Sequence, residues 1–180
     1  MTRYSLTQLA NLIDHTNLHP EATGADITAL CQEACDHGFK MVAINQVQTT
    51  LCHQLLYVEE EMHALVTLCR QEGALSKVIF ENGYLTEEEK IALCQIAKKV
   101  QPYFIKTATG FGPSGATLAD VRLMKEAVGP TVQVKAAGGI RTAEAFKQFV
   151  AAGATRIGTS SGITIMQELA AEASDGYVEI

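Results

Sequence analysis

Short apolar segments alternate with longer amphipathic segments along this chain, and that alternation limits its possible folds more than any other feature. Runs of three to five mostly apolar residues are typical of buried strands, and each is followed by apolar residues at the 3–4 spacing of a helix. Repeats of this kind, roughly 25 to 30 residues long, predict right-handed βαβ units around a parallel sheet. We expect six strands, at residues 13–16, 41–45, 77–81, 103–107, 132–135 and 156–158.

The composition agrees with one α/β domain that spans residues 1–180. The chain is 47% hydrophobic and 19% charged, proportions that suit a domain with a real core, and it contains no Trp. A net charge of −6 leaves no polybasic face for a nucleic acid or an anionic membrane. No apolar stretch approaches the roughly 20 residues of a membrane span, and the polar first residues lack a signal-peptide core. We therefore expect a cytoplasmic protein.

The five cysteines form an odd set without a CxxC pair, and all lie in helical patterns. This pattern predicts reduced, buried thiols. Ordinary core packing explains Cys31 and Cys35 better than a metal site shared with His37, so we expect no metal.

One long helix is expected in the middle of the chain, at residues 49–72. No Gly or Pro occurs between Phe39 and Glu72, and apolar residues keep a 3–4 rhythm there. The acidic run at residues 59–61 is best explained as a solvated face of this helix. The last ten residues, 171–180, show no clear period, and we assign them no element.

Two lysines interrupt buried strands near their carboxyl ends, Lys106 and Lys135. Functional groups of parallel α/β folds collect at such ends. A single lysine there could extend its amine to water, but two on successive strands are better explained by chemistry. Burial and a neighbouring ammonium both favour the neutral amine, which can attack a carbonyl. The protonated imine that forms is an electron sink, so an adjacent carbon–carbon bond can break without a metal or another cofactor.

Two glycine-containing loops lead from late strands into helices, at residues 136–142 and 158–162. Glycines allow close backbone approach, and helix-start N–H groups, serine hydroxyls and Arg141 supply donors for an anion. Tight turns alone would explain one such loop. Two on adjacent late strands are typical of the phosphate site of many barrels.

Several polar residues near other strand ends are weaker candidates. Asp14, His15 and Thr16 end the first expected strand, where Asp14 could assist proton transfer or serve as the ion partner of a lysine. His15 and His19 flank that strand end rather than share a helix face, which argues against a metal pair. Glu81 and Asn82 end the strand after the long helix and are expected at the same rim.

Four segments, taken together and in this order, resemble deoxyribose-phosphate aldolase. They are Ile-Asp-His-Thr-Asn-Leu at 13–18, Phe-Ile-Lys-Thr-Ala-Thr-Gly-Phe at 104–111, Val-Lys-Ala-Ala-Gly-Gly-Ile-Arg-Thr at 134–142 and Arg-Ile-Gly-Thr-Ser-Ser at 156–161. The likeness covers about residues 5–48 and 59–162. It implies a TIM-barrel class I aldolase that reversibly cleaves 2-deoxy-D-ribose 5-phosphate to acetaldehyde and D-glyceraldehyde 3-phosphate.

The resemblance also implies roles for individual residues. Lys106 would form the Schiff base, Lys135 would lower the pKa of Lys106 and join in proton transfer, and Asp14 matches a site carboxylate. The residues expected to line the phosphate end of the site are Gly110, Gly138, Gly139, Arg141, Gly158, Ser160 and Ser161.

The chain departs from the family between its second strand and Lys77. There the family carries two further strands, one of which holds an aspartate used as general acid and base, whereas this chain has a single helix. About forty residues and two of the eight barrel strands are therefore missing. A TIM-barrel-like βα repeat of six strands must either close more tightly or stay open. An open sheet exposes edges that invite pairing with a second copy, so we expect a homo-oligomer, a dimer.

Loss of the aspartate predicts a slow aldolase, because general acid–base assistance is worth about 10²–10⁴-fold. Asp14 or Glu81 could replace part of that assistance. Two alternatives stay open: a non-catalytic phosphosugar-binding remnant, and another phosphate-binding barrel lyase or isomerase. The second alternative explains the glycine loops but leaves the lysine pair without a reason.

Overall fold

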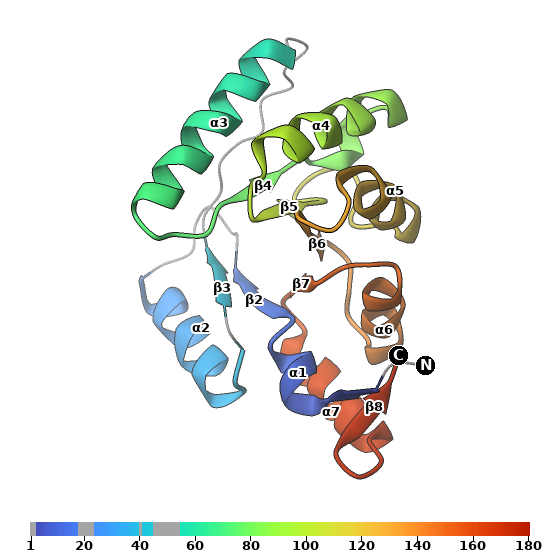
Figure 1. Ribbon diagram of the computed structural model, residues 1–180. Helices are drawn as coiled ribbons and strands as arrows, with labels where there is room; N and C mark the ends of the chain where they lie inside the picture. The colour runs from blue at the N-terminus through green and yellow to red at the C-terminus, as the bar shows by residue number, and fades with distance from the viewer. Residues whose placement is uncertain (1–2, 18–23, 40, 45–54) are drawn as a thin grey trace.

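The computed structural model describes residues 3–17, 24–39, 41–44 and 55–180, and its elements alternate as the sequence predicts (Figure 1). In chain order they are β1 (Arg3–Ser5), α1 (Leu6–Ala10), β2 (Ile13–Asn17), α2 (Gly24–Asp36), β3 (Met41–Ile44), α3 (Leu55–Gln71), β4 (Lys77–Ile79), a 3-10 turn (Asn82–Tyr84), α4 (Glu87–Val100), β5 (Phe104–Lys106), α5 (Leu118–Val128), β6 (Gln133–Ala137), α6 (Ala143–Ala151), β7 (Arg156–Thr159), α7 (Gly162–Glu172) and β8 (Tyr177–Glu179). The long helix expected at 49–72 is α3, and residues 49–54 lie outside the described residues.

The six predicted strands form one parallel sheet in the order β3-β2-β7-β6-β5-β4. In this order the first and last strands of the repeat, β2 and β7, are neighbours, as they are in a barrel. Within the described residues, β3 and β4 are the two edges and are not paired with each other. The opening lies where the sequence predicts two missing strands. Of the two expected outcomes, the open sheet is the one observed.

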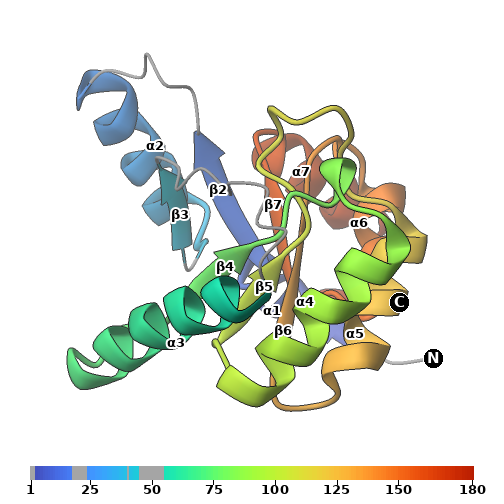
Figure 2. The same ribbon diagram turned by 90° about the horizontal axis from the view of Figure 1, so that it is seen from above.

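The open side changes the surroundings of the elements that border it. All three residues of β4 are only half-buried, whereas the three residues of β5 are buried. On α3, next to β4, Leu65 and Leu68 are 43% and 57% exposed. Figure 2 shows α2 and α3 diverging on this side, while the other helices lie close together. The missing units thus leave both strand edges and apolar helix surface without their usual neighbours.

Helix ends follow the local chemistry of the sequence. Thr86 caps α4 in a capping box with Glu89, and Thr117 and Thr142 accept backbone N–H groups at the starts of α5 and α6. After α2, Gly38 adopts a φ of 69°, a left-handed conformation that glycine reaches most easily. These signals determine where the helices begin and end.

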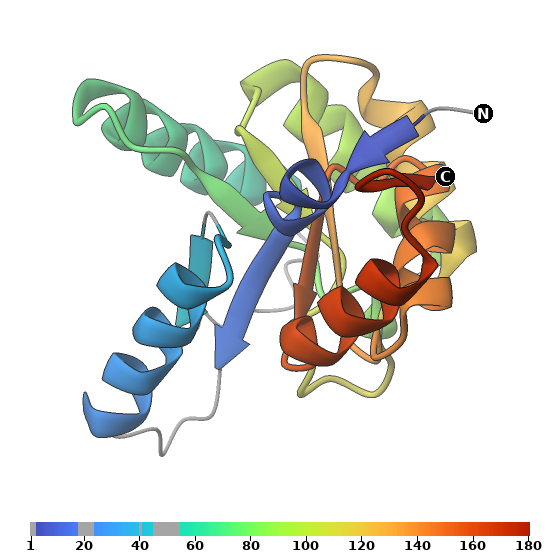
Figure 3. The same cartoon turned by 90° about the horizontal axis from the view of Figure 1, so that it is seen from below.

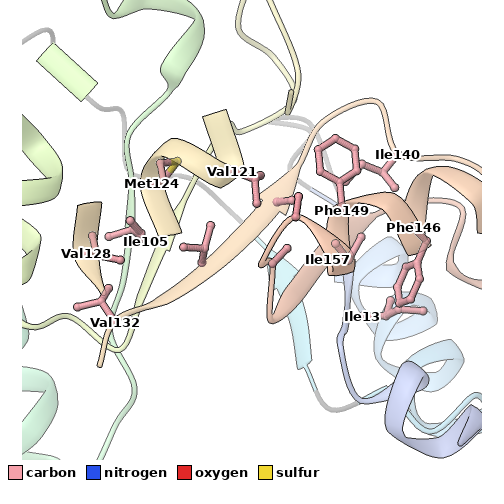
Figure 4. Close-up of a cluster of buried hydrophobic side chains, with 14 of the residues drawn as sticks. Ile13, Ile105, Val121, Met124, Val128, Val132, Ile140, Phe146, Phe149 and Ile157 are labelled. Carbon is pink, nitrogen blue, oxygen red and sulfur yellow. The ribbon is translucent and has the colours of Figure 1, made fainter. Parts of the chain in front are cut away.

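The strands alternate between an apolar outer face and a charged inner face. Ile13, Ile105 and Ile157 belong to the buried core between the sheet and its helices, together with residues such as Val121 and Phe146 (Figure 4). A charged residue stands next to an apolar one along four strands: Asp14 beside Ile13, Lys106 beside Ile105, Lys135 beside Val134 and Arg156 beside Ile157. The burial of the apolar set therefore determines which side chains enter the barrel.

The chain termini form a second, two-stranded sheet that the sequence analysis did not anticipate. β1 and β8 pair antiparallel, with Tyr4 opposite Val178, and Figure 3 shows them beside α1 and α7. Val178 is buried, and the Arg3 guanidinium lies 5.1 Å from the ring centre of Tyr177. The expectation that residues 171–180 form no element was thus wrong. A strand of three residues is too short for its alternation of apolar and polar residues to be recognised in the sequence.

The expectation of buried thiols holds for only part of the cysteine set. Cys94 is buried, but Cys69 is partly exposed and Cys35 is exposed, and all three are free. Cys35 lies near the carboxyl end of α2, next to the buried Ala34 but on an exposed face of the helix. Cys52 and His19 lie outside the described residues. Within the described part of the chain, no helix has both the length and the apolar character needed to cross a membrane.

Candidate active site

Three cations from three strands converge on one carboxylate inside the open barrel. Asp14 of β2 is fully buried, and its Oδ2 accepts hydrogen bonds from Lys135 Nζ of β6 at 2.5 Å and from Lys77 Nζ of β4 at 2.9 Å. Its Oδ1 accepts a hydrogen bond from Arg156 Nη1 of β7 at 2.8 Å. One anion thus links strands from both sides of the opening.

The structure places these groups at different depths along their strands. Asp14 is the second residue of β2, which continues to Asn17, so the strand expected at 13–16 is confirmed and is one residue longer. Lys77 and Arg156 are the first residues of β4 and β7. Lys135 is central in β6, and Lys106 is the last residue of β5. Lys106 stands at the carboxyl end of its strand, where functional groups collect, whereas Asp14, Lys77 and Arg156 lie within the first two residues of theirs.

The surroundings of Asp14 keep it ionised. Burial by itself would raise its pKa, but the positive charges of Lys135 and Lys77 and their hydrogen bonds outweigh burial and lower the pKa to about 2. A carboxylate of this kind is a fixed negative charge at neutral pH. It is a poor proton acceptor, because both its oxygens are already engaged by cations.

Lys106 is fully buried and lies opposite Lys135 in the register of β5 and β6. Burial lowers the pKa of Lys106 from its usual 10.5 to about 8, and the positive charge of Lys77 acts in the same direction. Asp14 and Glu81 act in the opposite direction. At pH 7 about a tenth of such an amine is neutral, compared with well under a thousandth of an ordinary lysine.

Lys135 is also driven toward its neutral form. Burial lowers its pKa well below the usual value, the charges of Lys106 and Lys77 lower it further, and the carboxylate of Asp14 opposes them. Three lysines and an arginine share this interior with Asp14 as their nearest anion. Because arginine keeps its proton, it is the lysines that lose protons and so reduce the excess positive charge.

Gly158 makes room for Lys135. A Cβ at Gly158 would lie 2.6 Å from Lys135 Cε, 3.2 Å from Lys135 Nζ and 2.9 Å from Ala137 Cβ. Gly158 was expected at the phosphate end, but it is a buried residue within β7, and the space beside it is filled by the lysine stem.

The loop after β6 differs from the expected anion site in one respect. Gly138 and Gly139 have φ values of 98° and 82°, and the Gly138 carbonyl accepts a hydrogen bond from Ala116 N at 3.1 Å. The first N–H groups of α6 were expected to face an anion. Instead Ala143 N donates to Glu168 Oε2 at 2.7 Å, and the Thr142 side chain caps Ala145 N.

The loop after β7 is tied to the loop after β6 through Thr159. The Thr159 hydroxyl donates to the Ile140 carbonyl at 2.6 Å and accepts from Ser161 N at 2.9 Å, so it joins the two glycine loops. The Ser161 side chain makes no capping hydrogen bond at the start of α7. Of the residues expected at the phosphate end, Gly110, Gly139, Arg141 and Ser160 are exposed, and Gly138 and Ser161 are partly exposed.

Glu81 and Asn82 follow β4 but point to different neighbours. Glu81 has a left-handed φ of 56°, and its Oε2 accepts hydrogen bonds from the backbone N–H of Thr109 at 3.0 Å and from the Thr109 hydroxyl. The Thr109 hydroxyl in turn accepts from Phe111 N at 3.1 Å. Glu81 thus holds the loop that follows Lys106. Asn82 donates to Met124 Sδ of α5 instead.

Sequence reasoning missed Lys77 and Arg156. Both are the first residues of their strands, where a charged side chain normally reaches solvent. Only polar residues near the carboxyl ends of strands were expected to be functional. A signal did exist for Arg156, because it precedes Gly158 by two residues and so shares its face of the strand. Lys77 had no comparable signal, since its side chain meets Asp14 only across the barrel.

Comparison with known proteins agrees with this geometry, although no protein-family model matches the chain. A deoxyribose-phosphate aldolase of Lactobacillus acidophilus is 41% identical to it, over 98% of this chain and 97% of the relative. A crystal structure of a deoxyribose-phosphate aldolase described as putative, from Coccidioides immitis, is 27% identical with a TM-score of 0.80, covering 93% of this chain and 88% of that one. The tetrameric deoxyribose phosphate aldolase of Aeropyrum pernix shares the fold, with 24% identity, 94% of each chain covered and a TM-score of 0.82.

The alignment to the Lactobacillus relative also shows how many residues this chain lacks. It extends over 230 positions, whereas this chain has 180 residues, so at least 50 positions of the alignment have no residue from this chain. This agrees with two absent βα units and with the opening between β3 and β4. Identity above 40% across nearly the whole of both proteins shows that this chain belongs to the deoxyribose-phosphate aldolase family.

Proposed function

We propose that this chain is a class I aldolase whose Lys106 forms a Schiff base, and that it reversibly cleaves 2-deoxy-D-ribose 5-phosphate to acetaldehyde and D-glyceraldehyde 3-phosphate. The observation that carries the proposal is the state of Lys106. Its amine is buried at the carboxyl end of β5, and its pKa is lowered to about 8. A buried amine of this kind is nucleophilic near neutral pH.

The proposed reaction proceeds through the imine. The neutral Lys106 amine adds to the aldehyde carbon of the open-chain sugar, and loss of water gives a protonated imine. Removal of the proton from the C3 hydroxyl then breaks the C2–C3 bond. Its electrons move into the imine to form an enamine, and glyceraldehyde 3-phosphate leaves. Protonation of the enamine at C2 and hydrolysis release acetaldehyde and restore the amine.

Lys135 is the proposed acid and base of these steps. Its lowered pKa makes the neutral amine available to accept a proton, and its protonated form is held by Asp14 at 2.5 Å. Asp14 itself, with a pKa of about 2 and three cationic partners, supports Lys135 rather than moves protons. Because the aspartate strand of the family has no counterpart here, we propose slow turnover, reduced by about 10²–10⁴-fold.

The phosphate is proposed to bind at the start of α7. Ser160 and Ser161 precede this helix, whose first turn has no side-chain cap, and the exposed Arg141 side chain comes from the neighbouring loop. Helix N-termini attract anions through their free N–H groups. Ser160→Asp should therefore raise the KM for the phosphorylated sugar and leave imine formation with acetaldehyde unchanged.

Trapping of the imine tests the proposed chemistry. The protein is incubated with acetaldehyde and borohydride, and the modified residue is located by intact mass and peptide mapping. The expected result is one stable adduct on Lys106, absent from Lys106→Leu and present in Lys99→Leu, which changes an exposed lysine. No adduct on protein that circular dichroism shows to be folded would favour the non-catalytic, phosphosugar-binding alternative.

A homodimer is the proposed assembly. The edge strands β3 and β4 border the opening, each paired within the described residues on its other side only, and exposed apolar side chains of α3 lie beside it. Edges of this kind pair readily with another chain. Light scattering after size-exclusion chromatography should give about twice the mass of one chain. A stable monomer at micromolar concentration would refute the dimer without affecting the proposed chemistry.

A further inference from the structure

Arg156 lies between an aromatic ring and the carboxylate of the site. Its guanidinium carbon lies 5.0 Å from the ring centre of Phe104, and its Nη1 donates to Asp14 Oδ1 at 2.8 Å. Phe104 is buried in β5, two residues before Lys106 and on the same face of the strand. The Arg156 side chain is only 11% exposed. The guanidinium is thus held in one place by contacts with two different strands.

Arg156 and the two lysines bind different oxygens of Asp14. Oδ1 is bound by Arg156, and Oδ2 is shared by Lys77 and Lys135. Arginine keeps its charge at every accessible pH, whereas the lysines can lose theirs. The charged groups facing this cluster are Lys77 and Glu81 from β4 and its end, Lys106 from β5, Lys135 from β6 and Arg156 from β7.

We propose that Arg156 is a positioning residue for the amine pair: by occupying one oxygen of Asp14 with a permanent charge, it limits the negative charge that the lysines receive. The proposal rests on the aldolase function proposed above, in which neutral lysines are needed. Without Arg156, both oxygens of Asp14 would be available to Lys77 and Lys135, and protonated lysines would be more stable. The site would then hold fewer neutral amines at the same pH.

The test compares Arg156→Met, which removes the charge, with Arg156→Lys, which replaces the permanent charge with one that can be lost. The ionisation of Lys106 is followed by the ¹³Cε resonance of labelled lysine across a pH titration of the intact protein, with Lys106→Met used to assign the signal. In Arg156→Met the midpoint should move upward by about one pH unit, which lowers the neutral fraction at pH 7 about tenfold. In Arg156→Lys the midpoint should lie between those of Arg156→Met and the wild type, because a lysine can lose its charge.

An unchanged or lower midpoint in folded Arg156→Met would overturn the proposal. The titration reads ionisation and needs no catalysis, so it remains decisive even if imine trapping fails and the proposed function falls. If Arg156→Met does not fold, Phe104→Leu replaces it, because this variant keeps the charge but removes the ring that holds the guanidinium. Its midpoint should also move upward, and a midpoint equal to that of the wild type would likewise overturn the proposal.

Discussion

Replacement of Lys106 by Met should make the protein more stable, although it removes the proposed nucleophile. Lys106 is fully buried, and its positive charge is opposed by burial and by Lys77. Met has nearly the same length, fills the same space and carries no charge. The variant therefore isolates the free energy of holding a protonated amine at this place.

The size of the gain follows from the pKa of Lys106. The difference between about 8 in the folded chain and the usual 10.5 corresponds to about 3 kcal/mol. Because the folded-state pKa is the lower one, this penalty is fully present below pH 8 and disappears as the pH rises to 10.5. At pH 7 the free energy of unfolding should rise by up to about 3 kcal/mol, or about 5–10 °C in Tm for a chain of this size.

Urea unfolding of wild type and Lys106→Met at a series of pH values measures this effect. The difference between the two proteins should be largest near pH 7 and should vanish near pH 10.5. The matched control is Lys98→Met on the exposed end of α4, which should change stability by less than about 1 kcal/mol and in the unfavourable direction. A Lys106→Met variant that is less stable than wild type at pH 7, or a gain that does not depend on pH, would refute the reasoning.

Three further results should follow from the same interior. Trapping of the imine should reach half its plateau near pH 8, and in Lys77→Met this midpoint should move upward because a cation is removed; an equal midpoint would contradict the influence of Lys77. Gly158→Ala should slow trapping at least about tenfold, because the added Cβ would lie 2.6 Å from Lys135 Cε; an unaffected rate would show that the amine tolerates displacement. Asp14→Asn should lower stability by about 3–5 kcal/mol, since it leaves buried cations without their anion. Wild type, whose Asp14 has a folded-state pKa of about 2, should also lose about 2 kcal/mol as the pH falls from 4 to 2, and urea unfolding of the variant should show no such loss.

The order and type of the elements could be predicted because each depends on local pattern. The parallel strands have apolar outer residues such as Ile105 and Ile157, and the helices carry caps such as Thr86 and Thr142 that need no distant partner. The absence of two units could also be predicted, but only through the family resemblance, because this chain has one long helix where the family carries two further strands. The β1–β8 pair could not, since neither strand has a signal without the other.

The site was only half predictable, for a related reason. Lys106 and Lys135 were found because a charged residue interrupts an apolar strand near its carboxyl end. Lys77 and Arg156 begin their strands, and what makes them part of the site is their distance of 2.9 and 2.8 Å from Asp14. That closeness depends on the curvature of the sheet, which no local pattern records.

The sequence by itself determined the βα repeat and the two lysines on successive strands, because alternation and interrupted apolar runs are properties of adjacent residues. Its resemblance to the family indicated the place of the missing strands. Only the tertiary structure decided that the sheet stays open between β3 and β4, and that one carboxylate joins β2 to β4, β6 and β7 across the interior. It also decided which helix start remains uncapped, because Glu168 reaches α6 from a different helix. The physical reason is common to all three: charge pairing and strand closure act between residues far apart in the chain, and their energies depend on distances that exist only after folding.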